Sequence, residues 1–247
     1  MRQVTQNYKS GKIRIESVNS PVCKEGGALV RTAFSVISAG TEGMKVKEGK
    51  MSLVGKAMAR PDQVKKVLKS VRQQGLAATF DKVMNKLDSL TPLGYSLSGT
   101  VVEVGSGLPG IRVGQRVACG GAEYAHHAEF VYVPKNLMVP VPDEVSLPHA
   151  AFATIGAIAM QGFRQAGLQL GETACVVGLG LLGQIMVRIL RAAGMHAVGV
   201  DLSPSRCELG RAGGAKLATT PGRPSRSRAG TSAATTLKTA AVPPSWR

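Results

Sequence analysis

The pattern of apolar and polar positions between Thr173 and Asp201 organises the chain. A short apolar run over 174–177 is typical of a buried parallel strand. From residue 181 the apolar positions recur with helical spacing, and a glycine at 194 ends that pattern. A second apolar run over 197–200 then leads to an acidic residue. The order of strand, turn, helix, strand and acid predicts one βαβ unit of a doubly wound parallel sheet.

The turn of this unit reads G-x-G-x-x-G, a pattern typical of dinucleotide binding. The first glycine permits a tight turn, the second lets a pyrophosphate approach the backbone, and the third lets the helix pack against the sheet. The free N–H groups of the helix start then face the phosphates. We expect the cofactor to contact Gly178, Gly180, Leu181, Leu182 and Gly183. The alternative is a glycine-rich turn in an ordinary βαβ unit.

Asp201 lies 18 residues beyond Gly183, where its carboxylate can accept hydrogen bonds from both hydroxyls of an adenosine ribose. The same charge repels a 2′-phosphate, so we expect NAD(H) to be favoured over NADP(H). Arg206 is close enough in sequence to weaken that preference. In the alternative interpretation, Asp201 is a solvated strand end.

The excess of basic residues is concentrated in two segments of the sequence. The net charge is +16, yet seven of the basic residues lie in 209–247, where no residue is acidic. A second excess lies between Lys45 and Lys86, with eleven basic and three acidic residues. Aromatic residues do not interleave with the charges of this second group, so we expect a solvated helix face there and no nucleic-acid partner. The alternative is a basic face that meets a phosphate-bearing substrate or nucleic acid. The four cysteines are scattered, which favours reduced, structural thiols.

The first half of the chain predicts a different fold. Alternating apolar residues and dense glycine turns over 1–40 and 93–142 indicate short strands of a compact barrel. Residues 38–43 read as a polar, glycine-flanked loop. Apolar stripes over 61–88 predict a basic helical hairpin inserted into this half. The fold class is therefore α/β with β: a β-barrel domain over 1–145 with that insertion, then a partial Rossmann domain over 146–218.

The order of these motifs resembles the medium-chain dehydrogenase/reductase superfamily, which includes zinc alcohol and threonine dehydrogenases. The motifs are P-L-G-Y-S-L-S-G-T-V-V-E-V-G-S-G, V-G-Q-R-V-A, A-A-F-A-T-I-G-A-I-A-M-Q-G and V-V-G-L-G-L-L-G. The resemblance implies a GroES-like N-terminal domain and NAD(P)-dependent oxidation or reduction of an alcohol or carbonyl. The S-A-G-T-E loop, the basic insertion and P-L-G-Y-S are similar to a bi-domain oxidoreductase branch, associated with sugar or cell-envelope polysaccharide metabolism.

The departures from this family pattern concern the metal. Ala39 stands where zinc members have a cysteine ligand, Tyr95 and Ser96 replace a histidine and a glutamate, and Thr154-Ile155 stand near a later cysteine ligand. His126 and His127 are adjacent, which favours a surface-loop role. We therefore predict no zinc. By resemblance, Thr41 occupies the position of a relay hydroxyl and Glu42 the acidic position after it. The candidate catalytic residues are Thr41, Tyr95 and Glu42; alternatively, Tyr95 fills an empty zinc pocket and Glu42 makes a structural ion pair.

Residues 219–247 change character. They contain four prolines and no acidic residue, which is typical of a disordered basic tail. A doubly wound sheet needs further strands here, so we expect a truncated or frameshifted reading of a longer enzyme. The resemblance implies an NAD(P)-dependent dehydrogenase/reductase, and the truncation predicts that this chain is itself inactive. The alternatives are an oxidoreductase and a catalytically inactive fragment or binding module with a basic tail.

The N-terminal residues lack the apolar core of a signal peptide, and no apolar run is long enough for a membrane helix. We therefore expect a cytoplasmic protein with no membrane partner. The expected partner is a small alcohol, carbonyl or sugar-like substrate. An oligomer is compatible with the sequence. The sequence does not identify one particular substrate.

Overall fold

The computed structural model describes residues 1–7, 10–51, 58, 72–73, 75, 90–221 and 238–239. The chain divides into two compact units, Met1–Thr154 and Ile155–Arg247, which we call unit 1 and unit 2. The predicted hairpin over 61–88 falls outside the described residues except at 72–73 and 75. The structure divides the chain inside a helix, whereas the sequence predicted domain boundaries after residues 145 and 218. Those domain limits stay predictions.

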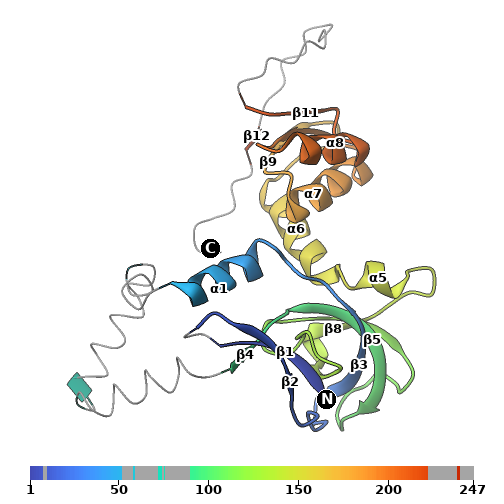
Figure 1. Ribbon diagram of the computed structural model, residues 1–247. Helices are drawn as coiled ribbons and strands as arrows, with labels where there is room; N and C mark the ends of the chain where they lie inside the picture. The colour runs from blue at the N-terminus through green and yellow to red at the C-terminus, as the bar shows by residue number, and fades with distance from the viewer. Residues whose placement is uncertain are drawn as a thin grey trace, which may run out of the picture. The chain divides into compact units, whose positions relative to one another are not determined.

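Unit 1 is built from two antiparallel sheets (Figure 1). The larger sheet has the order β7-β3-β5-β6-β8 and the smaller one the order β2-β1-β4. A bridge from Gln3 to Ala128 joins β1 to the segment that precedes β7. The strands are β1 (Arg2–Asn7), β2 (Ile13–Ser17), β3 (Gly27–Ser35), β4 (Leu90–Pro92), β5 (Ser96–Val104), β6 (Arg116–Gly120), β7 (Phe130–Pro134) and β8 (Met138–Pro140), with a 3-10 turn η1 (Lys135–Leu137) before β8.

The core of unit 1 follows from the alternation along these strands. Inward positions of the two longest strands are buried, including Val30 on β3 and Leu97 and Val101 on β5. Gly99 lies where β5 crosses β3 so closely that a Cβ atom would stand 2.2 Å from the carbonyl oxygen of Arg31. The β structure predicted for this half is confirmed, and only a glycine fits where β5 approaches the Arg31 carbonyl.

The loop predicted over 38–43 is wrong in its second half, because helix α1 (Thr41–Lys50) begins there. The carbonyl oxygens of Ser38, Ala39 and Gly40 accept the first helical hydrogen bonds, from the N–H groups of residues 42–44. The Glu42 carboxylate reaches back to accept a hydrogen bond from the Ser38 N–H at 2.9 Å. This hydrogen bond resembles one half of a capping box. It compensates for Gly40 and Gly43, which are poor helix formers.

Two helices follow β8: α5 (Leu147–Ala150) and α6 (Ala153–Gln165). The hydroxyl of Ser96 donates a 2.6 Å hydrogen bond to the Ala151 carbonyl, and that of Ser98 donates one of 2.6 Å to the Leu147 carbonyl. These bonds tie both ends of α5 to β5. They explain why the compact unit extends beyond the predicted boundary at residue 145.

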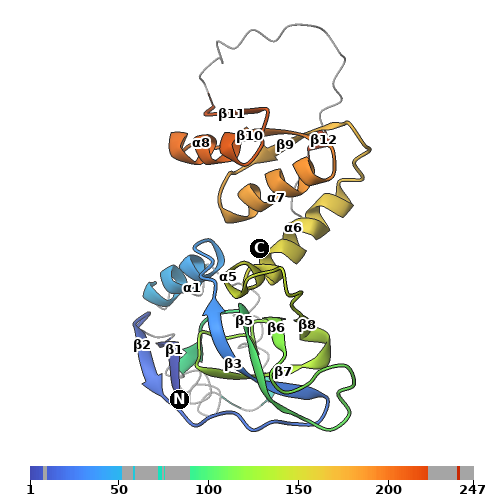
Figure 2. The same ribbon diagram turned by 90° about the vertical axis from the view of Figure 1, so that its right-hand side faces the viewer.

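Unit 2 contains a parallel sheet in the order β11-β10-β9-β12, with helices packed against it (Figure 2). Its elements are β9 (Thr173–Val177), α7 (Leu181–Ala192), β10 (His196–Val200), α8 (Pro204–Ala212), β11 (Leu217–Thr219) and β12 (Lys238–Thr239). The order places the strand that follows β11 beside β9, as in doubly wound folds. The predicted βαβ unit is confirmed to within one residue at each strand and at the helix start.

Residues of the predicted tail add a strand to this sheet. Lys238 pairs with Ala174, and Thr239 pairs with Cys175, both in parallel register. Thr219 belongs to β11. The disorder predicted for the rest of 219–247 concerns residues that are almost all outside the described part of the chain, and it stays a prediction. Within the described part, no helix has the length and apolar character that crossing a membrane requires.

Candidate functional site

The glycine turn between β9 and α7 has the geometry that its three glycines predict. Gly178 has a φ of +92°, a conformation that side chains with a Cβ rarely adopt. A Cβ on Gly183 would stand 1.9 Å from the Gly178 carbonyl oxygen, so the helix start and the strand end touch. A Cβ on Gly180 would meet nothing within 4 Å. Open space at that position leaves room for a ligand against the backbone.

The first turn of α7 presents unsatisfied donors beside this space. Gly180 is the N-cap residue and has no side chain to cap the helix, and the first helical bond runs from the Gln184 N–H to its carbonyl at 2.8 Å. The N–H groups before Gln184 therefore have no partner within the helix. Leu181 and Leu182, whose N–H groups are among them, are exposed. Such a helix start attracts anions such as a pyrophosphate.

Asp201 follows β10 and lies against the same turn. Its Oδ2 atom accepts a 2.8 Å hydrogen bond from the Leu179 N–H, and its Oδ1 atom accepts one of 2.8 Å from the Ser203 N–H. The Arg206 guanidinium lies 3.7 Å from Oδ2. The Ser203 hydrogen bond, the Leu179 hydrogen bond and the Arg206 charge, in that order, hold the pKa of Asp201 below its usual range. The side chain is therefore a fixed carboxylate at the glycine turn.

Two exposed apolar side chains lie at the adjoining ends of β9 and β10. Val177 ends β9 and is 72% exposed, and Leu202 follows Asp201 and is 85% exposed. Sequence reasoning missed them, because apolar residues at strand ends look like core residues. Apolar side chains left in solvent beside a polar anchor are typical of ligand sites.

Unit 1 holds a separate polar cluster at the start of α1. The Nε2 atom of His127 lies 2.9 Å from the Glu42 Oε2 atom, and the side chains are 9% and 7% exposed, respectively. The Nδ1 atom of His127 lies 2.9 Å from the hydroxyl oxygen of Ser35, an exposed residue at the end of β3. His127 lies in a loop as predicted, but its side chain is only 9% exposed between these partners, so the surface part of that prediction is wrong.

The backbone of the loop before β5 fixes His127 in place. Gly94, with a φ of +101°, is so close that a Cβ would stand 2.6 Å from the His127 nitrogen. The His127 N–H donates a 2.8 Å hydrogen bond to the Leu93 carbonyl. Tyr95 is next along the chain and is half-buried. The structure thus brings the loop carrying Tyr95 to His127, which holds Glu42.

The predicted roles of the three candidate catalytic residues stay predictions. Glu42 makes a pair with His127, which matches the structural alternative for this residue. Thr41 begins α1 and is exposed. Neither the Thr41 hydroxyl nor the Tyr95 phenol makes a side-chain hydrogen bond within the described residues. The sequence did not single out His127 or Ser35 as candidate catalytic residues, although His127 contacts both Ser35 and Glu42.

Comparison with known proteins adds to this geometry. Residues 68–143 match the alcohol dehydrogenase GroES-like domain. (R,R)-butanediol dehydrogenase of Bacillus subtilis (strain 168) is 32% identical over 138 residues, which is 46% of this chain and 40% of that protein. D-guloside 3-dehydrogenase of Escherichia coli (strain K12) is 32% identical over 130 residues, which is 52% of this chain and 37% of that protein.

Solved structures show the same fold. Galactitol-1-phosphate dehydrogenase from Escherichia coli superposes with a TM-score of 0.67 at 17% identity, over 88% of this chain and 60% of that one. Part of the chain is therefore similar in sequence to alcohol and butanediol dehydrogenases, and the fold is that of the medium-chain dehydrogenases among the solved structures. The chain spans about two fifths of the length of the two curated relatives named above.

Zinc members of the superfamily supply the test for a metal centre. A structural or catalytic zinc ion needs three or four nitrogen, sulfur or oxygen ligands. Within the described residues, no three His, Cys, Asp or Glu side chains gather closely enough to hold a metal ion. The hydroxyl of Ser96, which replaces a family glutamate, is buried and donates to the Ala151 carbonyl. Burial raises the pKa of the Cys119 thiol to about 12, which disfavours a thiolate ligand. The described residues do not fit zinc.

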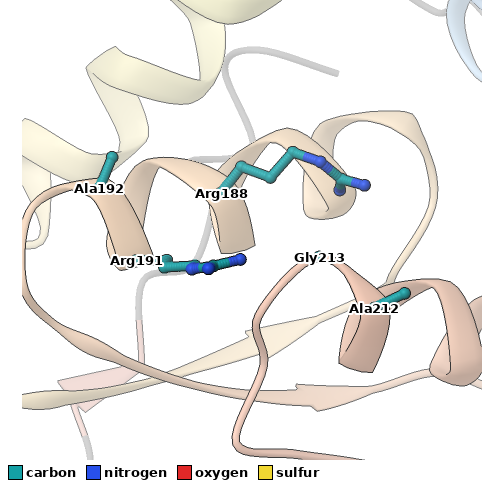
Figure 3. A pocket seen from close by; sticks show the side chains of 5 residues that line it. All are labelled: Arg188, Arg191, Ala192, Ala212 and Gly213. Carbon is teal, nitrogen blue, oxygen red and sulfur yellow. The ribbon is translucent and has the colours of Figure 1, made fainter.

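A pocket of about 350 Å³ lies elsewhere in unit 2, at the C-terminal ends of α7 and α8. Figure 3 shows the side chains of Arg188 and Arg191 extending from α7 toward Gly213. The other lining residues are Ala192 and Ala212. Cationic side chains at helix C-termini stabilise the carbonyl groups exposed there. The pocket is at the opposite end of α7 from the glycine turn, about 18 Å along the helix, so it does not belong to the candidate cofactor site.

Proposed function

We propose that this chain is an NAD(H)-dependent, zinc-free oxidoreductase that moves a hydride between the cofactor and an alcohol or carbonyl substrate. The observation that carries the proposal is the Asp201 carboxylate, held by the Leu179 N–H at 2.8 Å against an open glycine turn. The turn and the helix start would hold the pyrophosphate. Asp201 would hold the adenosine ribose, with Val177 and Leu202 as apolar contacts for the adenine.

The preference for NAD(H) rests on charge and on unused acceptor capacity. Each oxygen of an ionised carboxylate has two lone-pair directions. One direction on each Asp201 oxygen is taken by a backbone N–H, which leaves acceptors for both ribose hydroxyls. A 2′-phosphate would meet that negative charge. Arg206 opposes this effect only weakly, because its side chain is 57% exposed and 3.7 Å away.

The substrate class is proposed from the relatives. Their names include butanediol dehydrogenase, D-guloside 3-dehydrogenase and probable D-xylulose reductase A, which act on small hydroxylated molecules by those names. Together with the S-A-G-T-E and P-L-G-Y-S motifs, they support a sugar-like alcohol or ketone and a place near the bi-domain oxidoreductase branch. A cytoplasmic location and the absence of a nucleic-acid partner stay predictions from the sequence.

The test is hydride transfer by the full chain after treatment with a zinc chelator. The chain is incubated with NAD⁺ and either (R,R)-2,3-butanediol or xylitol, and NADH is measured by its absorbance. We expect NADH to form at the same rate with and without the chelator. No NADH with either alcohol would contradict hydride transfer by this chain. A rate that is lost on chelation and restored by added zinc would contradict the zinc-free mechanism.

A further inference from the structure

The side chain of Gln184, in the first turns of α7, links the glycine turn to helix α8. Its Nε2 atom donates a 3.1 Å hydrogen bond to the Leu179 carbonyl oxygen and one of 3.0 Å to the Arg206 carbonyl oxygen. Its Oε1 atom accepts a 3.2 Å hydrogen bond from the Arg188 guanidinium. Carbonyl oxygens only accept and guanidinium groups only donate, so these partners determine which way the amide points. Both amide donors are therefore used within unit 2.

The bond to Leu179 satisfies a buried backbone group. Leu179 is 0% exposed, and within the described residues its carbonyl oxygen receives no hydrogen bond other than that of Gln184. A buried carbonyl without a donor is costly, so this peptide group keeps its orientation. The N–H of Leu179 is held as well, by Asp201 Oδ2 at 2.8 Å. The peptide groups on both sides of Leu179 are thus fixed.

The fixed Leu179 carbonyl also determines the direction of the Gly180 N–H. The two groups belong to one planar trans peptide, in which the C=O and N–H bonds point in opposite directions. The Gly180 N–H therefore points away from the Gln184 amide, and it donates no hydrogen bond within the described part of the chain. The space that a Cβ on Gly180 would enter is open to 4 Å. Gln184 thus keeps one donor of the glycine turn free for an anion.

The second bond of Gln184 anchors the start of α8. Arg206 lies in the first turn of that helix, and its backbone carbonyl is the acceptor. Its guanidinium lies 3.7 Å from Asp201 Oδ2. A 2′-phosphate on a ribose held by Asp201 would attract the same guanidinium. Because the bond restrains the backbone of Arg206, it limits how far the side chain can leave Asp201 to meet such a phosphate.

We propose that Gln184 is a positioning residue for the dinucleotide: it orients the Gly180 N–H for the pyrophosphate and keeps Arg206 beside Asp201, which favours NAD(H). The inference rests on the proposed function, because it concerns the same site. A purely structural role leads to a different expectation. If Gln184 only satisfied the Leu179 carbonyl, its loss would weaken the binding of NADH and NADPH to the same degree.

The chain offers a matched control in Gln161. It is exposed on α6, and its side chain makes no hydrogen bond within the described residues. Substitution of glutamine by methionine removes the amide and keeps the charge, the approximate length and the helix propensity. Q184M therefore removes the two bonds, whereas Q161M makes the same chemical change without removing a contact.

The first experiment is ¹H–¹⁵N NMR of the full chain without nucleotide. We expect the side-chain amide protons of Gln184 to exchange with solvent about tenfold more slowly than those of Gln161, because they are hydrogen-bonded. The backbone N–H signal of Gly180 should shift in Q184M and stay in place in Q161M. Equal exchange rates for the two side chains would overturn the positioning role, and this result does not depend on whether the chain binds a nucleotide.

The second experiment is a fluorescence titration of the unsubstituted chain, Q184M and Q161M with NADH and NADPH. We expect Q184M to weaken NADH binding by about threefold to tenfold and NADPH binding by less, because the released Arg206 can reach the 2′-phosphate. Q161M should match the unsubstituted chain. Thermal melts check the fold of each variant, and Q184N, which keeps an amide on a shorter side chain, gives a milder form of the same comparison.

The outcomes separate this inference from the proposed function. Equal weakening of NADH and NADPH binding, or no weakening, would overturn the positioning role and leave the proposed function intact. Binding of neither nucleotide by the unsubstituted chain would overturn both. A preference for NADH that falls in Q184M and persists in Q161M is the result that the structure predicts.

Discussion

The backbone N–H of Leu179 donates a 2.8 Å hydrogen bond to the carboxylate of Asp201, 22 residues further along the chain. This bond joins the glycine turn after β9 to the end of β10. The residue expected to hold the ribose and the turn expected to hold the phosphates are therefore parts of one rigid corner. Substitutions at this corner should separate effects on folding from effects on cofactor binding.

Gly180→Ala and Gly183→Ala should affect different properties: the first should weaken NADH binding, and the second should lower the free energy of unfolding. The Cβ added at Gly180 enters open space, and its φ of −70° suits alanine, so the melting temperature should stay unchanged. The methyl group would occupy the pyrophosphate position and weaken NADH binding by at least about tenfold, or about 1.4 kcal/mol. Isothermal titration calorimetry checks the binding. Unchanged affinity in G180A would argue against a phosphate at this turn.

Gly183→Ala should instead destabilise the contact between α7 and β9. Its Cβ would stand 1.9 Å from the Gly178 carbonyl oxygen, a rigid backbone atom. Separating α7 from β9 should cost about 1–3 kcal/mol of unfolding free energy, as overpacking does in cores. Urea denaturation followed by circular dichroism measures this loss, with G180A as the matched control. A G183A variant as stable as G180A would contradict the close contact.

The stability that Asp201 supplies should depend on pH. Hydrogen bonds lower its pKa in the folded state, so its contribution is present above the unfolded pKa of about 3.9 and is lost as pH falls through the lower folded value. D201N should be less stable at pH 7 by about 1–2 kcal/mol, and this difference should shrink below about pH 4. Thermal melts from neutral to acidic pH measure the difference. D143N, at an exposed aspartate, is the control. A difference that grows on acidification would refute the assignment.

Glu42→Ala should destabilise unit 1. The variant leaves the His127 imidazole buried without its acceptor and frees the Ser38 N–H at the start of α1. Removing one partner of a buried pair costs about 3 kcal/mol or more. Urea denaturation should show the loss, whereas the exposed Glu123→Ala should show none. Equal stability of the two variants would mean that the pair does not hold α1 in place.

The sequence predicted the geometry of the glycine turn and its βαβ unit well and the contact between His127 and Glu42 poorly, for a physical reason. Gly178, Gly183 and Asp201 lie within one βαβ unit, where the glycine spacing and the apolar periodicity determine the geometry. His127 and Glu42 are 85 residues apart in sequence. Their contact depends on how β3, α1 and the loop before β5 assemble, and no local pattern encodes it. Likewise, the sequence did not predict that α1 begins at Thr41, because Gly40 and Gly43 have low helix propensities. The hydrogen bond from the Ser38 N–H to the Glu42 carboxylate stabilises this helix start, and propensities do not include such a bond.

The most direct test of the account is a fluorescence titration of the full chain and of D201N with NADH and NADPH. We predict that the unsubstituted chain binds NADH at least about tenfold more tightly than NADPH. D201N should lose most of that preference, because the charge that repels the 2′-phosphate is gone. NADPH binding as tight as NADH binding by the unsubstituted chain would contradict the role of Asp201. If neither nucleotide bound, the glycine turn would not be a dinucleotide site in this chain.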